Sequence, residues 1–464
     1  MTNDERPIAA IATALAPAAL AAIRLSGDRT VDLLAERFSR PEALRRAGGH
    51  TMHHGSILDA GGRAVDEVLV AVYRRPRSYT GEESAEVFCH GSPAGVRRVL
   101  AVLLSSGFAA ARPGEFTRRA FLNGRLDLTR AEAVNEIVSA HTAHAHALAL
   151  DRLEGSVEAA VGEVRAELIA MMAQLAVQLD YPEEETGPVE VDADRLRRAG
   201  ERARSIASTY GRGRLFQEGV RVAIAGRTNA GKSALFNRLL RHDRSIVSDV
   251  HGTTRDYVEA LIDVDGIPLR LYDTAGLRAS NESVEEEGIR RSHEIISGSD
   301  LVLYVVDASS GLTADDRERL DWIRPRTPAL LVLNKSDLAP ASSSAGGAEP
   351  GPWARSEPDA ATRVSAWTGE GIDELNAAVS AALLRAAAGA TASDVVIDSE
   401  RQHALLLRAA EAVDRTVESL EAGVSADATA VDLQEALDAV GEITGEVASA
   451  EILDAMFAGF CVGK

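Results

Sequence analysis

The sequence predicts a multidomain protein that combines α/β and all-α parts, and three observations support this. The chain has 464 residues, which is enough for about three domains. Residues 218–386 alternate strand-like runs with helical segments at the spacing of a doubly wound sheet. Long helical segments flank this region on both sides, from Leu126 onward and again from Ser399.

Residues 1–120 are expected to form a compact α/β domain. Two segments are strand-like and a third has the period of an amphipathic helix: residues 21–25, 65–72 and 92–105. The polar residues 77–83 lie between strand signals, and we expect a solvated loop there.

The apolar run of residues 8–23 superficially resembles the core of a signal peptide. Asp4 and Glu5 stand where positive charge is needed, and Pro17 interrupts the run. We therefore expect two strands joined by a loop.

From Leu126 the pattern predicts long helices with a break near Gly155. His141, His144 and His146 lie in this stretch. On a helix His146 points away from the other two, and no Cys or carboxylate completes a ligand set, so metal binding is disfavoured.

Another helix is expected over residues 192–210, and it is rich in arginine. The arginines are Arg195, Arg197, Arg198, Arg202 and Arg204. A solvated helix face is the favoured interpretation, and an RNA-binding patch is the alternative.

Six segments of the central region are expected to be strands: residues 220–225, 257–264, 267–272, 300–306, 328–333 and 362–365. The Ser/Gly/Pro-rich residues 341–359 are expected to form a loop, and residues 386–393 a linker. Helices are expected over residues 400–422 and 431–457. The two phenylalanines near the C-terminus predict that the end of the chain is packed.

Composition limits the partners and the compartment. The formal net charge of −20 means that RNA contact would need a local basic patch. Cys89 and Cys461 form no disulfide framework, which indicates a reducing, cytoplasmic location. Cys461 is either a nucleophile or a buried tail residue, and burial is favoured because no paired base is evident. No apolar run is long enough to cross a bilayer, so no membrane partner is expected.

The most informative motif runs from Gly226 to Ser233 and fits G-x-x-x-x-G-K-S, the phosphate-binding P-loop. An apolar strand precedes it and a helix follows it, as the motif requires. The glycines let successive N–H groups face phosphate oxygens, and the helix N-terminus adds positive potential. Lys232 is expected to reach the β- and γ-phosphates, and the Ser233 hydroxyl to hold magnesium.

Four further segments follow the P-loop in the order of a GTPase: Gly252–Asp256, Asp273–Gly276, Asn334–Asp337 and Val364–Ala366. Thr254 is expected to complete the magnesium shell, and Asp273 to contact it through water. The Asp337 carboxylate can accept hydrogen bonds from guanine N1–H and its exocyclic amine, whereas adenine lacks this pair of donors. The five segments together predict a guanine-nucleotide domain.

Hydrolysis needs a group that orients the attacking water. Ras-like enzymes place a Gln directly after the D-x-x-G segment, but this chain has Leu277 there. The water-orienting residue must lie elsewhere, and the acidic residues 282–287 follow closely.

The motifs of the central region, together with segments outside it, resemble the MnmE (TrmE) family of tRNA-modification GTPases. The resemblance rests on GRTNAGKS, GTTRD, DTAGLR, TGEE at 80–83, RPGEFTRRAFLNGRLDLTRAEA at 112–133 and FCVGK at 460–464. It covers essentially the whole chain. The resemblance implies an N-terminal α/β folate-binding and dimerisation domain (1–120), a helical domain in two parts (121–217 and 387–464), and an inserted GTPase domain (218–386).

The resemblance also implies partners and chemistry. In the family, a homodimer works with the FAD-dependent MnmG (GidA) in a heterotetramer. Together they build an aminomethyl-type group on the wobble uridine of certain tRNAs, with one carbon from a tetrahydrofolate derivative (5-formyl or 5,10-methylene). Potassium and transient pairing of GTPase domains activate hydrolysis. This chain has no flavin or nicotinamide fingerprint of its own, so the redox chemistry would need the partner.

Family positions carry over to named residues. Potassium would contact Asn229, Ser248, the Val250 carbonyl and Thr253, and Glu285 would orient the water. Folate would contact Arg24, Glu82, Arg125 and Lys464. The nucleotide-contacting positions fall on Asn229, Ala230, Gly231, Lys232, Ser233, Ala234, Ser248, Asp249, Val250, His251, Gly252, Thr253, Thr254, Asp273, Thr274, Ala275, Gly276, Asn334, Lys335, Asp337, Ser365 and Ala366.

One segment departs from the family pattern, because the glycine-rich first loop is here LAPAALA at residues 15–21. Two alternatives remain for the whole chain. One is a ribosome-assembly GTPase of the Era or Der type, and the other is a switch GTPase with no tRNA-modifying role.

Overall fold

The computed structural model describes residues 6–180, 192–242, 259–273, 290, 293–338, 361–387 and 395–464. The chain separates into two compact units. The first unit contains residues 1–138, 150–200 and 408–464, and the second contains residues 139–149 and 201–407. The finer division into four domains stays a prediction.

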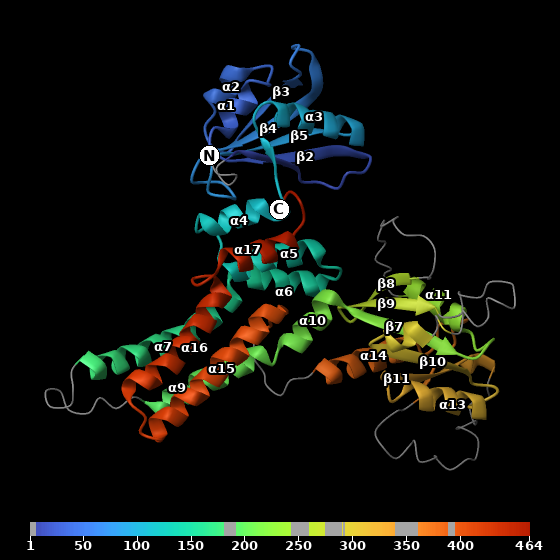
Figure 1. Cartoon of the computed structure of the whole chain (residues 1–464). Coiled ribbons are helices and arrows are strands. Elements are labelled where there is room, and N and C mark those ends of the chain that lie inside the picture. The colour runs from blue at the N-terminus through green and yellow to red at the C-terminus, as the bar shows by residue number, and fades with distance from the viewer. Residues whose placement is uncertain are drawn as a thin grey trace. The chain divides into compact units, whose positions relative to one another are not determined.

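The first unit begins with a six-stranded sheet in the order β3-β4-β5-β2-β1-β6 (Figure 1). Neighbouring strands are antiparallel except for β1 and β6, which are parallel. Its elements are β1 (Ile8–Ile11), β2 (Ala18–Ser26), α1 (Thr30–Ala35), α2 (Pro41–Arg45), β3 (Thr51–Leu58), β4 (Ala64–Tyr73), β5 (Ser84–Gly91), α3 (Pro93–Ser105), β6 (Ala109–Ala110) and α4 (Glu115–Leu122). The two strands and the loop expected over residues 8–23 are confirmed, although β2 begins within the glycine-poor segment.

Alternation along the strands gives this sheet two different faces. Ile23 and Leu25 of β2 and Val87 of β5 are fully buried and pack with residues of α1 and α3. Arg24 and Glu86 occupy the intervening positions, so they lie on the other face, where Arg24 Nε is 3.1 Å from Glu86 Oε1. The face under α1 and α3 forms the main core. The other face carries Arg24 and Glu86, and at β1 it packs Ile8 and Ala10 against Phe116 of α4.

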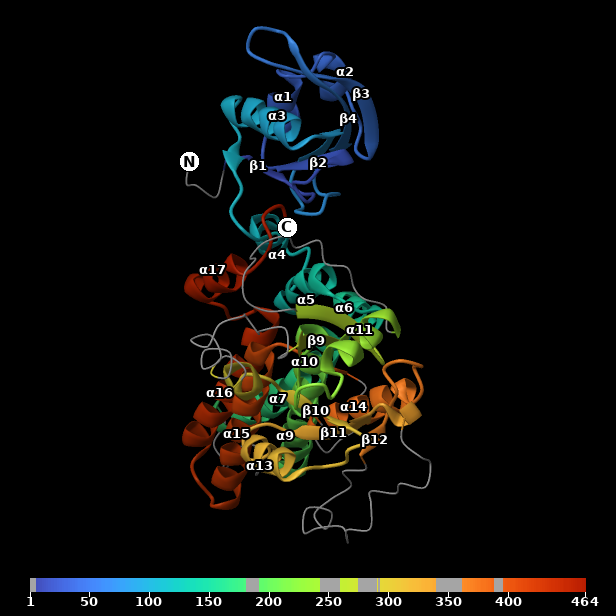
Figure 2. The same ribbon diagram turned by 90° about the vertical axis from the view of Figure 1, so that its right-hand side faces the viewer.

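The rest of the first unit is helical. In the sequence, the helices that come after the first sheet and before the second are α5 (Leu128–Ser139), α6 (Ala143–Glu154), α7 (Ser156–Asp180), α9 (Ala193–Ala207) and α10 (Tyr210–Glu218). The C-terminal helices are α15 (Glu400–Glu421), α16 (Ala426–Thr444) and α17 (Ala450–Ala458). The last residue of α5, parts of α6, α9 and α15, and all of α10 belong to the second unit. The break near Gly155 is confirmed. Within the first unit, α7 packs along α16, and α17 lies beside α4 (Figures 1 and 2).

The single helix expected over residues 431–457 is wrong, because two helices occupy this stretch. Gly445 ends α16 in a left-handed conformation with φ 89°. Ser449 then caps α17, since its side-chain oxygen accepts a hydrogen bond from Ile452 N. The cap-and-stop signals therefore override the continuous apolar pattern.

The single helix expected over residues 192–210 is also wrong. Helix α9 ends at Ala207 and α10 begins at Tyr210. Between them, the Thr209 hydroxyl donates to Ile206 O at 2.7 Å and accepts from Ile397 N at 3.1 Å. A threonine that bonds to the local backbone in this way competes with the helical pattern.

The C-terminal segment packs inside the first unit, as expected. Phe457 and Phe460 are 2% and 8% exposed, and they form an apolar cluster with Leu128 and Ala131 of α5. The expected burial of Cys461 is wrong, because its side chain is exposed. Its carbonyl accepts from Gly114 N at 3.3 Å, so the backbone is held while the thiol faces solvent.

The second unit is built on a six-stranded sheet in the order β12-β11-β10-β7-β9-β8. All neighbours are parallel except β8 and β9. The elements are β7 (Val220–Gly226), α11 (Lys232–His242), β8 (Glu259–Val264), β9 (Ile267–Asp273), β10 (Leu301–Asp307), α13 (Ala314–Ile323), β11 (Ala329–Asn334), a 3₁₀ turn (Ser336–Leu338), β12 (Thr362–Arg363) and α14 (Ile372–Ala387). All six expected strands are present, with bounds within two residues of the predicted ones.

Helices cover both faces of this sheet, as in a doubly wound fold. Leu235 of α11 and Leu375 of α14 join the core on one face, and Leu320 of α13 joins the core on the other. The expected loop at residues 341–359 and most of the expected linker lie outside the described residues. Among the helices that the structure describes, none is both long and apolar enough to cross a membrane.

Candidate functional site

The P-loop motif joins the end of β7 to the start of α11, and its glycines are sterically required. Gly226 has φ 139° and Gly231 has φ 92°. A Cβ atom at Gly226 would collide with Val305 O, and one at Gly231 with Asn334 Nδ2. The intervening Asn229 also has a positive φ, of 64°. The loop is thus a tight main-chain turn that ends at a helix N-terminus, which is an anion-binding geometry.

Two side chains at the start of α11 are positioned for phosphate and metal chemistry. Lys232 is 8% exposed, and its ammonium donates to Gly226 O at 2.9 Å and to Arg227 O at 2.7 Å. The Ser233 hydroxyl donates to Asp273 Oδ2 at 2.7 Å. Strands β7 and β9 are parallel with Ile224 opposite Asp273, so this register delivers the carboxylate to the loop.

The base-recognition segments lie at the same edge of the sheet. Asn334, at the end of β11, is 1% exposed. Its Nδ2 donates to Ala230 O at 3.0 Å, and its Oδ1 accepts from Ala366 N at 3.0 Å. The carboxylate of Asp337 accepts from Ser365 Oγ at 2.6 Å. One buried amide therefore connects the phosphate loop to the segment that is predicted to close over the base.

The remaining nucleotide-contacting predictions divide into two groups. Ala234 lies in the first turn of α11, and Lys335 has φ 62° with its ammonium 2.7 Å from Asp307 Oδ2. The others lie outside the described residues: Ser248, Asp249, Val250, His251, Gly252, Thr253, Thr254, Thr274, Ala275, Gly276 and Glu285. Of the four predicted potassium ligands, only Asn229 is described.

Sequence analysis missed two residues of this site. Asp307 ends β10 just as Asp273 and Asn334 end their strands, so its place after an apolar run was a usable signal. Burial raises the pKa of Asp307, but hydrogen bonds from Lys335 and Ser309 outweigh it and leave the pKa below its ordinary value. A carboxylate held ionised in this way anchors Lys335.

The second missed residue is Arg238 of α11. Its Nε donates to Ala366 O at 2.8 Å, and its Nη2 donates to Trp367 O. Arg238 and Ala366 are 128 positions apart in the chain, and no local sequence pattern indicates their contact. Arg238 holds the base segment from the helix that also carries the phosphate loop.

The four predicted folate residues lie in two pairs within the first unit. The Arg24 guanidinium donates to Gly463 O at 3.1 Å and lies over the ring of Tyr79. Burial lowers the pKa of the Lys464 ammonium, and the positive charge of the nearby Arg24 lowers it further.

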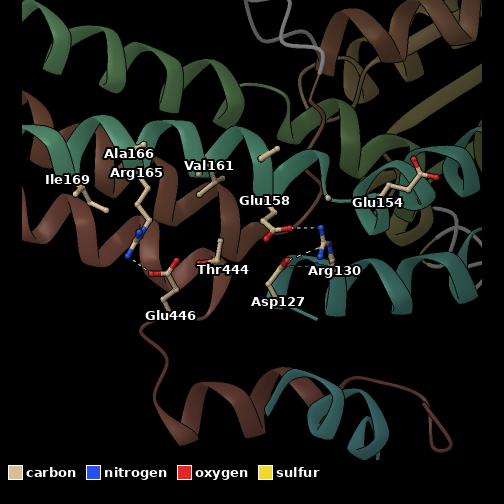
Figure 3. A pocket seen from close by; sticks show the side chains of 13 residues that line it. Asp127, Arg130, Glu154, Glu158, Val161, Arg165, Ala166, Ile169, Thr444 and Glu446 are labelled. Carbon is tan, nitrogen blue, oxygen red and sulfur yellow. Dashed lines mark hydrogen bonds and ion pairs between the residues drawn. The ribbon is translucent and has the colours of Figure 1, made fainter. Parts of the chain in front are cut away.

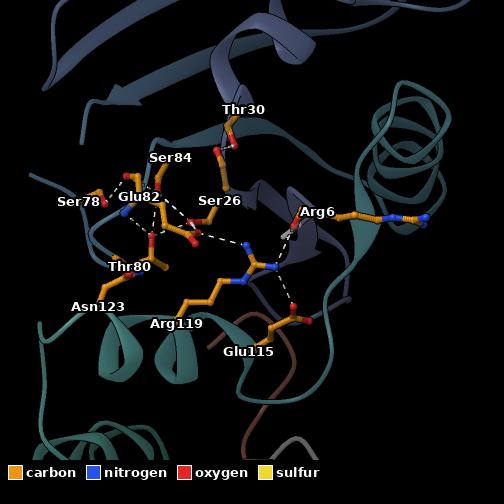
Figure 4. A network of polar contacts seen from close by, with 11 residues as sticks. Arg6, Ser26, Thr30, Ser78, Thr80, Glu82, Ser84, Glu115, Arg119 and Asn123 are labelled. Atoms are coloured by element: carbon orange, nitrogen blue, oxygen red, sulfur yellow. Dashed lines mark hydrogen bonds and ion pairs between the residues drawn. The ribbon is translucent and has the colours of Figure 1, made fainter. Parts of the chain in front are cut away.

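In the second pair, Glu82 accepts a hydrogen bond from Ser26, two positions along β2 from Arg24 (Figure 4). The side chain of Arg125 lies against the adjacent Gly81, where an added Cβ would be 3.3 Å from Arg125 Cγ. Strand β2 therefore links the two pairs.

Two other features do not add to a site. Within the described ranges, no group of three or more His, Cys, Asp or Glu side chains is placed to hold a metal ion. The His144 ring instead packs against Phe216, with ring centroids 4.2 Å apart. In the arginine-rich helix α9, Arg195 pairs with Glu167 at 2.7 Å and Arg197 with Glu421, so these two charges are neutralised locally.

A cavity of about 740 Å³ lies between helices of the first unit (Figure 3). Both arginines of its lining are paired, with Arg130 Nη2 2.6 Å from Glu158 Oε2 and Arg165 paired with Glu446. None of the described residues predicted to bind nucleotide, metal or folate lines it. We therefore do not assign the predicted chemistry to this cavity.

Comparison with known proteins identifies relatives along the whole chain. Residues 7–125 match the family model described as GTP-binding protein TrmE N-terminus, and residues 128–461 match the one described as MnmE helical domain. The protein named tRNA modification GTPase MnmE from Treponema denticola is 42% identical, covering 99% of this chain and 98% of that protein. The protein of the same name from Symbiobacterium thermophilum is 41% identical, covering 99% of this chain and 100% of that protein.

Among solved structures, a point variant of Aquifex aeolicus Era bound to GDP.AlF4- is 23% identical and covers 44% of this chain and 67% of that one. The TM-score is 0.27, which is too low to support any conclusion about function.

Replacing Arg238 by Met should weaken binding of GDP about 10- to 100-fold. Each lost hydrogen bond from the charged donor contributes roughly 1.5–3 kcal/mol, and only part of this free energy appears as lost affinity because the loop relaxes. Calorimetric titration with GDP checks this. Arg241→Met, which removes an exposed arginine from the same helix, is the matched control and should bind GDP like the unaltered protein. Equal affinities in the two variants would show that Arg238 does not hold the base segment.

Proposed function

The chain belongs to the MnmE family of tRNA modification GTPases, and from this premise we propose a specific reaction for it. It acts with an FAD-dependent flavoprotein of the MnmG (GidA) type. Together they install an aminomethyl-type (carboxymethylaminomethyl) group at C5 of the wobble uridine of certain tRNAs. A tetrahydrofolate derivative (5-formyl or 5,10-methylene) donates the carbon, and potassium-activated hydrolysis of GTP in the cytoplasm accompanies the reaction.

One observation supports this proposal above the others. The family models match on both sides of the nucleotide site, at the N-terminal sheet and in the helices that precede and follow the P-loop domain. A ribosome-assembly GTPase of the Era or Der type would account only for the central segment. A switch role without tRNA modification leaves the folate-type cluster of the first unit unexplained.

The nucleotide site offers the donors that phosphoryl transfer requires. The main-chain turn of residues 226–231 and the Lys232 ammonium would bind the phosphates. The Ser233 hydroxyl, which donates to Asp273, is a hard oxygen donor that fits magnesium; Asp273 would contact the ion through water, and Thr254 is proposed to complete the set. Bound magnesium would neutralise charge that develops on the phosphate oxygens. Asp337, fixed by Ser365, would select guanine.

Water activation and cation binding are assigned to residues outside the described ranges, apart from Asn229. Leu277 has no polar group, so Glu285 is proposed to orient the attacking water. Asn229, Ser248, Val250 and Thr253 are proposed to hold potassium, which would supply the positive charge that other GTPases obtain from an arginine. Asn229 fits this role because it lies within the phosphate loop and its side chain carries an amide oxygen.

The cluster around Arg24 fits a folate. Folates carry carboxylates that suit Arg24, Arg125 and Lys464, and they carry a pteridine whose N–H groups suit the Glu82 carboxylate. A bound tetrahydrofolate would supply the one-carbon unit. The Arg24 guanidinium over the Tyr79 ring is held beside the C-terminal residues.

A homodimer is part of the proposal, and the N-terminal sheet supports it. Leu20, Met52 and Leu69 are 64%, 60% and 40% exposed. By strand register all three lie on the same sheet face as Arg24. An exposed apolar face next to the folate cluster is suited to a second copy of the chain.

GTP hydrolysis should be several-fold faster in potassium than in sodium at equal ionic strength, because the cation would stabilise transition-state charge. Steady-state phosphate release in the two salts measures this.

The Glu285→Ala variant should lose about 10²-fold or more in the rate of GTP hydrolysis while GTP binding stays intact. Equal rates in both salts would refute the cation role, and an active Glu285→Ala protein would refute the role of Glu285.

The Arg24→Ala variant should bind 5-formyltetrahydrofolate about 10- to 100-fold more weakly, since charge-assisted hydrogen bonds contribute roughly 1.5–3 kcal/mol. Calorimetry provides the measurement. Arg97→Ala removes an exposed arginine of α3 and is the control. Unchanged affinity in Arg24→Ala would remove the proposed site from this sheet face.

A further inference from the structure

The first unit contains a buried arginine that sequence analysis did not single out. Arg119 of α4 is 5% exposed. Its Nη1 donates to Glu82 Oε2 at 3.2 Å, and its Nη2 donates to Glu115 Oε1 at 3.0 Å and to Arg6 O at 2.9 Å. Figure 4 shows this guanidinium between the two carboxylates. One buried guanidinium therefore forms ion pairs with two carboxylates.

The contacts of Glu82 fix one of its oxygens. Besides Arg119, Oε2 accepts the Ser26 hydroxyl at 2.8 Å, and Ser26 is itself within 2.6 Å of Thr80 Oγ1 and 3.2 Å of Ser84 Oγ (Figure 4). Among the described residues, Glu82 Oε1 has no hydrogen-bond partner. The carboxylate is therefore anchored through Oε2, and Oε1 is left to accept a hydrogen bond from a ligand.

The anchoring is costly to disturb. Removing one partner of a buried guanidinium–carboxylate contact leaves the other charge buried and uncompensated, which is strongly unfavourable. Glu115 is 4% exposed, so it competes with Glu82 for the same cation. The position of Arg119 is thereby set by two acids on different segments of the chain.

The same helix turn also holds the C-terminus. Gly114 N donates to Cys461 O at 3.3 Å, and Phe116 N donates to Lys464 O at 3.2 Å. Glu115 stands between these two residues, at the start of α4. The helix that aims Arg119 at Glu82 therefore also fixes the backbone of Lys464.

We propose that Arg119 is a positioning residue of the folate site, which holds the Glu82 carboxylate in place for the N–H groups of the pteridine and ties that orientation, through α4, to the C-terminal Lys464. This inference rests on the proposed folate site. Arg119 does not contact the folate itself and acts through Glu82. It follows that its contribution to binding should disappear when Glu82 can no longer act as a carboxylate.

A double-mutant cycle tests this with 5-formyltetrahydrofolate and calorimetry on the full chain. Glu82→Gln and Arg119→Met should each weaken binding at least tenfold, and the double variant should be no weaker than Glu82→Gln alone. Arg119→Lys, which keeps the charge, should recover part of the affinity. Arg152→Met is the matched control, because Arg152 is 2% exposed and pairs with Glu136 at 2.7 Å in the same unit. This control should bind folate normally.

The outcomes separate the two proposals. If Glu82→Gln binds folate as well as the unaltered protein, the proposed folate site is wrong. If Glu82→Gln is weakened but Arg119→Met is not, or if the two losses add fully in the double variant, the site stands and the role of Arg119 is overturned. Should Arg119→Met fail to fold, Arg119→Met combined with Glu115→Gln removes both opposed buried charges and replaces it in the cycle.

Discussion

The side-chain amide of Asn334 is the interaction on which the nucleotide site depends. It is buried, donates to the phosphate loop at Ala230 and accepts from the base segment at Ala366. Gly231 must be a glycine because a Cβ there would collide with this amide. The amide therefore joins the two halves of the site into one cradle. Ordering the site on binding would otherwise reduce affinity, since immobilising flexible groups costs free energy.

The parallel sheet explains why these groups meet. Strands β7, β9, β10 and β11 all end at one edge, and their last residues or following loops provide the P-loop, Asp273, Asp307 and Asn334. Ligands of open α/β sheets bind outside the carboxyl ends of the strands.

The proposed folate site of the first unit is built in a different way. There, the antiparallel strands β2 and β5 place Arg24 and Glu86 on the sheet face opposite α1 and α3, and α4 brings buried charge and the C-terminal residues to that cluster.

Much of the fold and of the nucleotide site could be predicted from the sequence, because the patterns that indicate them lie within short segments of the chain. The strand bounds of the second unit follow from apolar runs, and the P-loop from its glycine spacing. The breaks at Gly445 and Thr209 were missed, because a cap or a threonine bond interrupts a helix whose apolar period continues. The exposure of Cys461 was missed because only its backbone is engaged. Arg238 and Arg119 could not be assigned, since their partners are distant in sequence and no motif spacing connects them.

The central claim is that this cradle selects guanine through the Asp337 carboxylate. Competition binding of GTP, ATP and XTP to the unaltered protein and to Asp337→Asn tests it most directly. The unaltered protein should prefer GTP over ATP by about 10⁴-fold or more, because a ligand without the paired donors leaves a carboxylate unsatisfied. Asp337→Asn, which offers a donor as well as an acceptor, should shift the preference toward XTP. Equal binding of ATP and GTP, or an unchanged GTP preference in Asp337→Asn, would contradict the account.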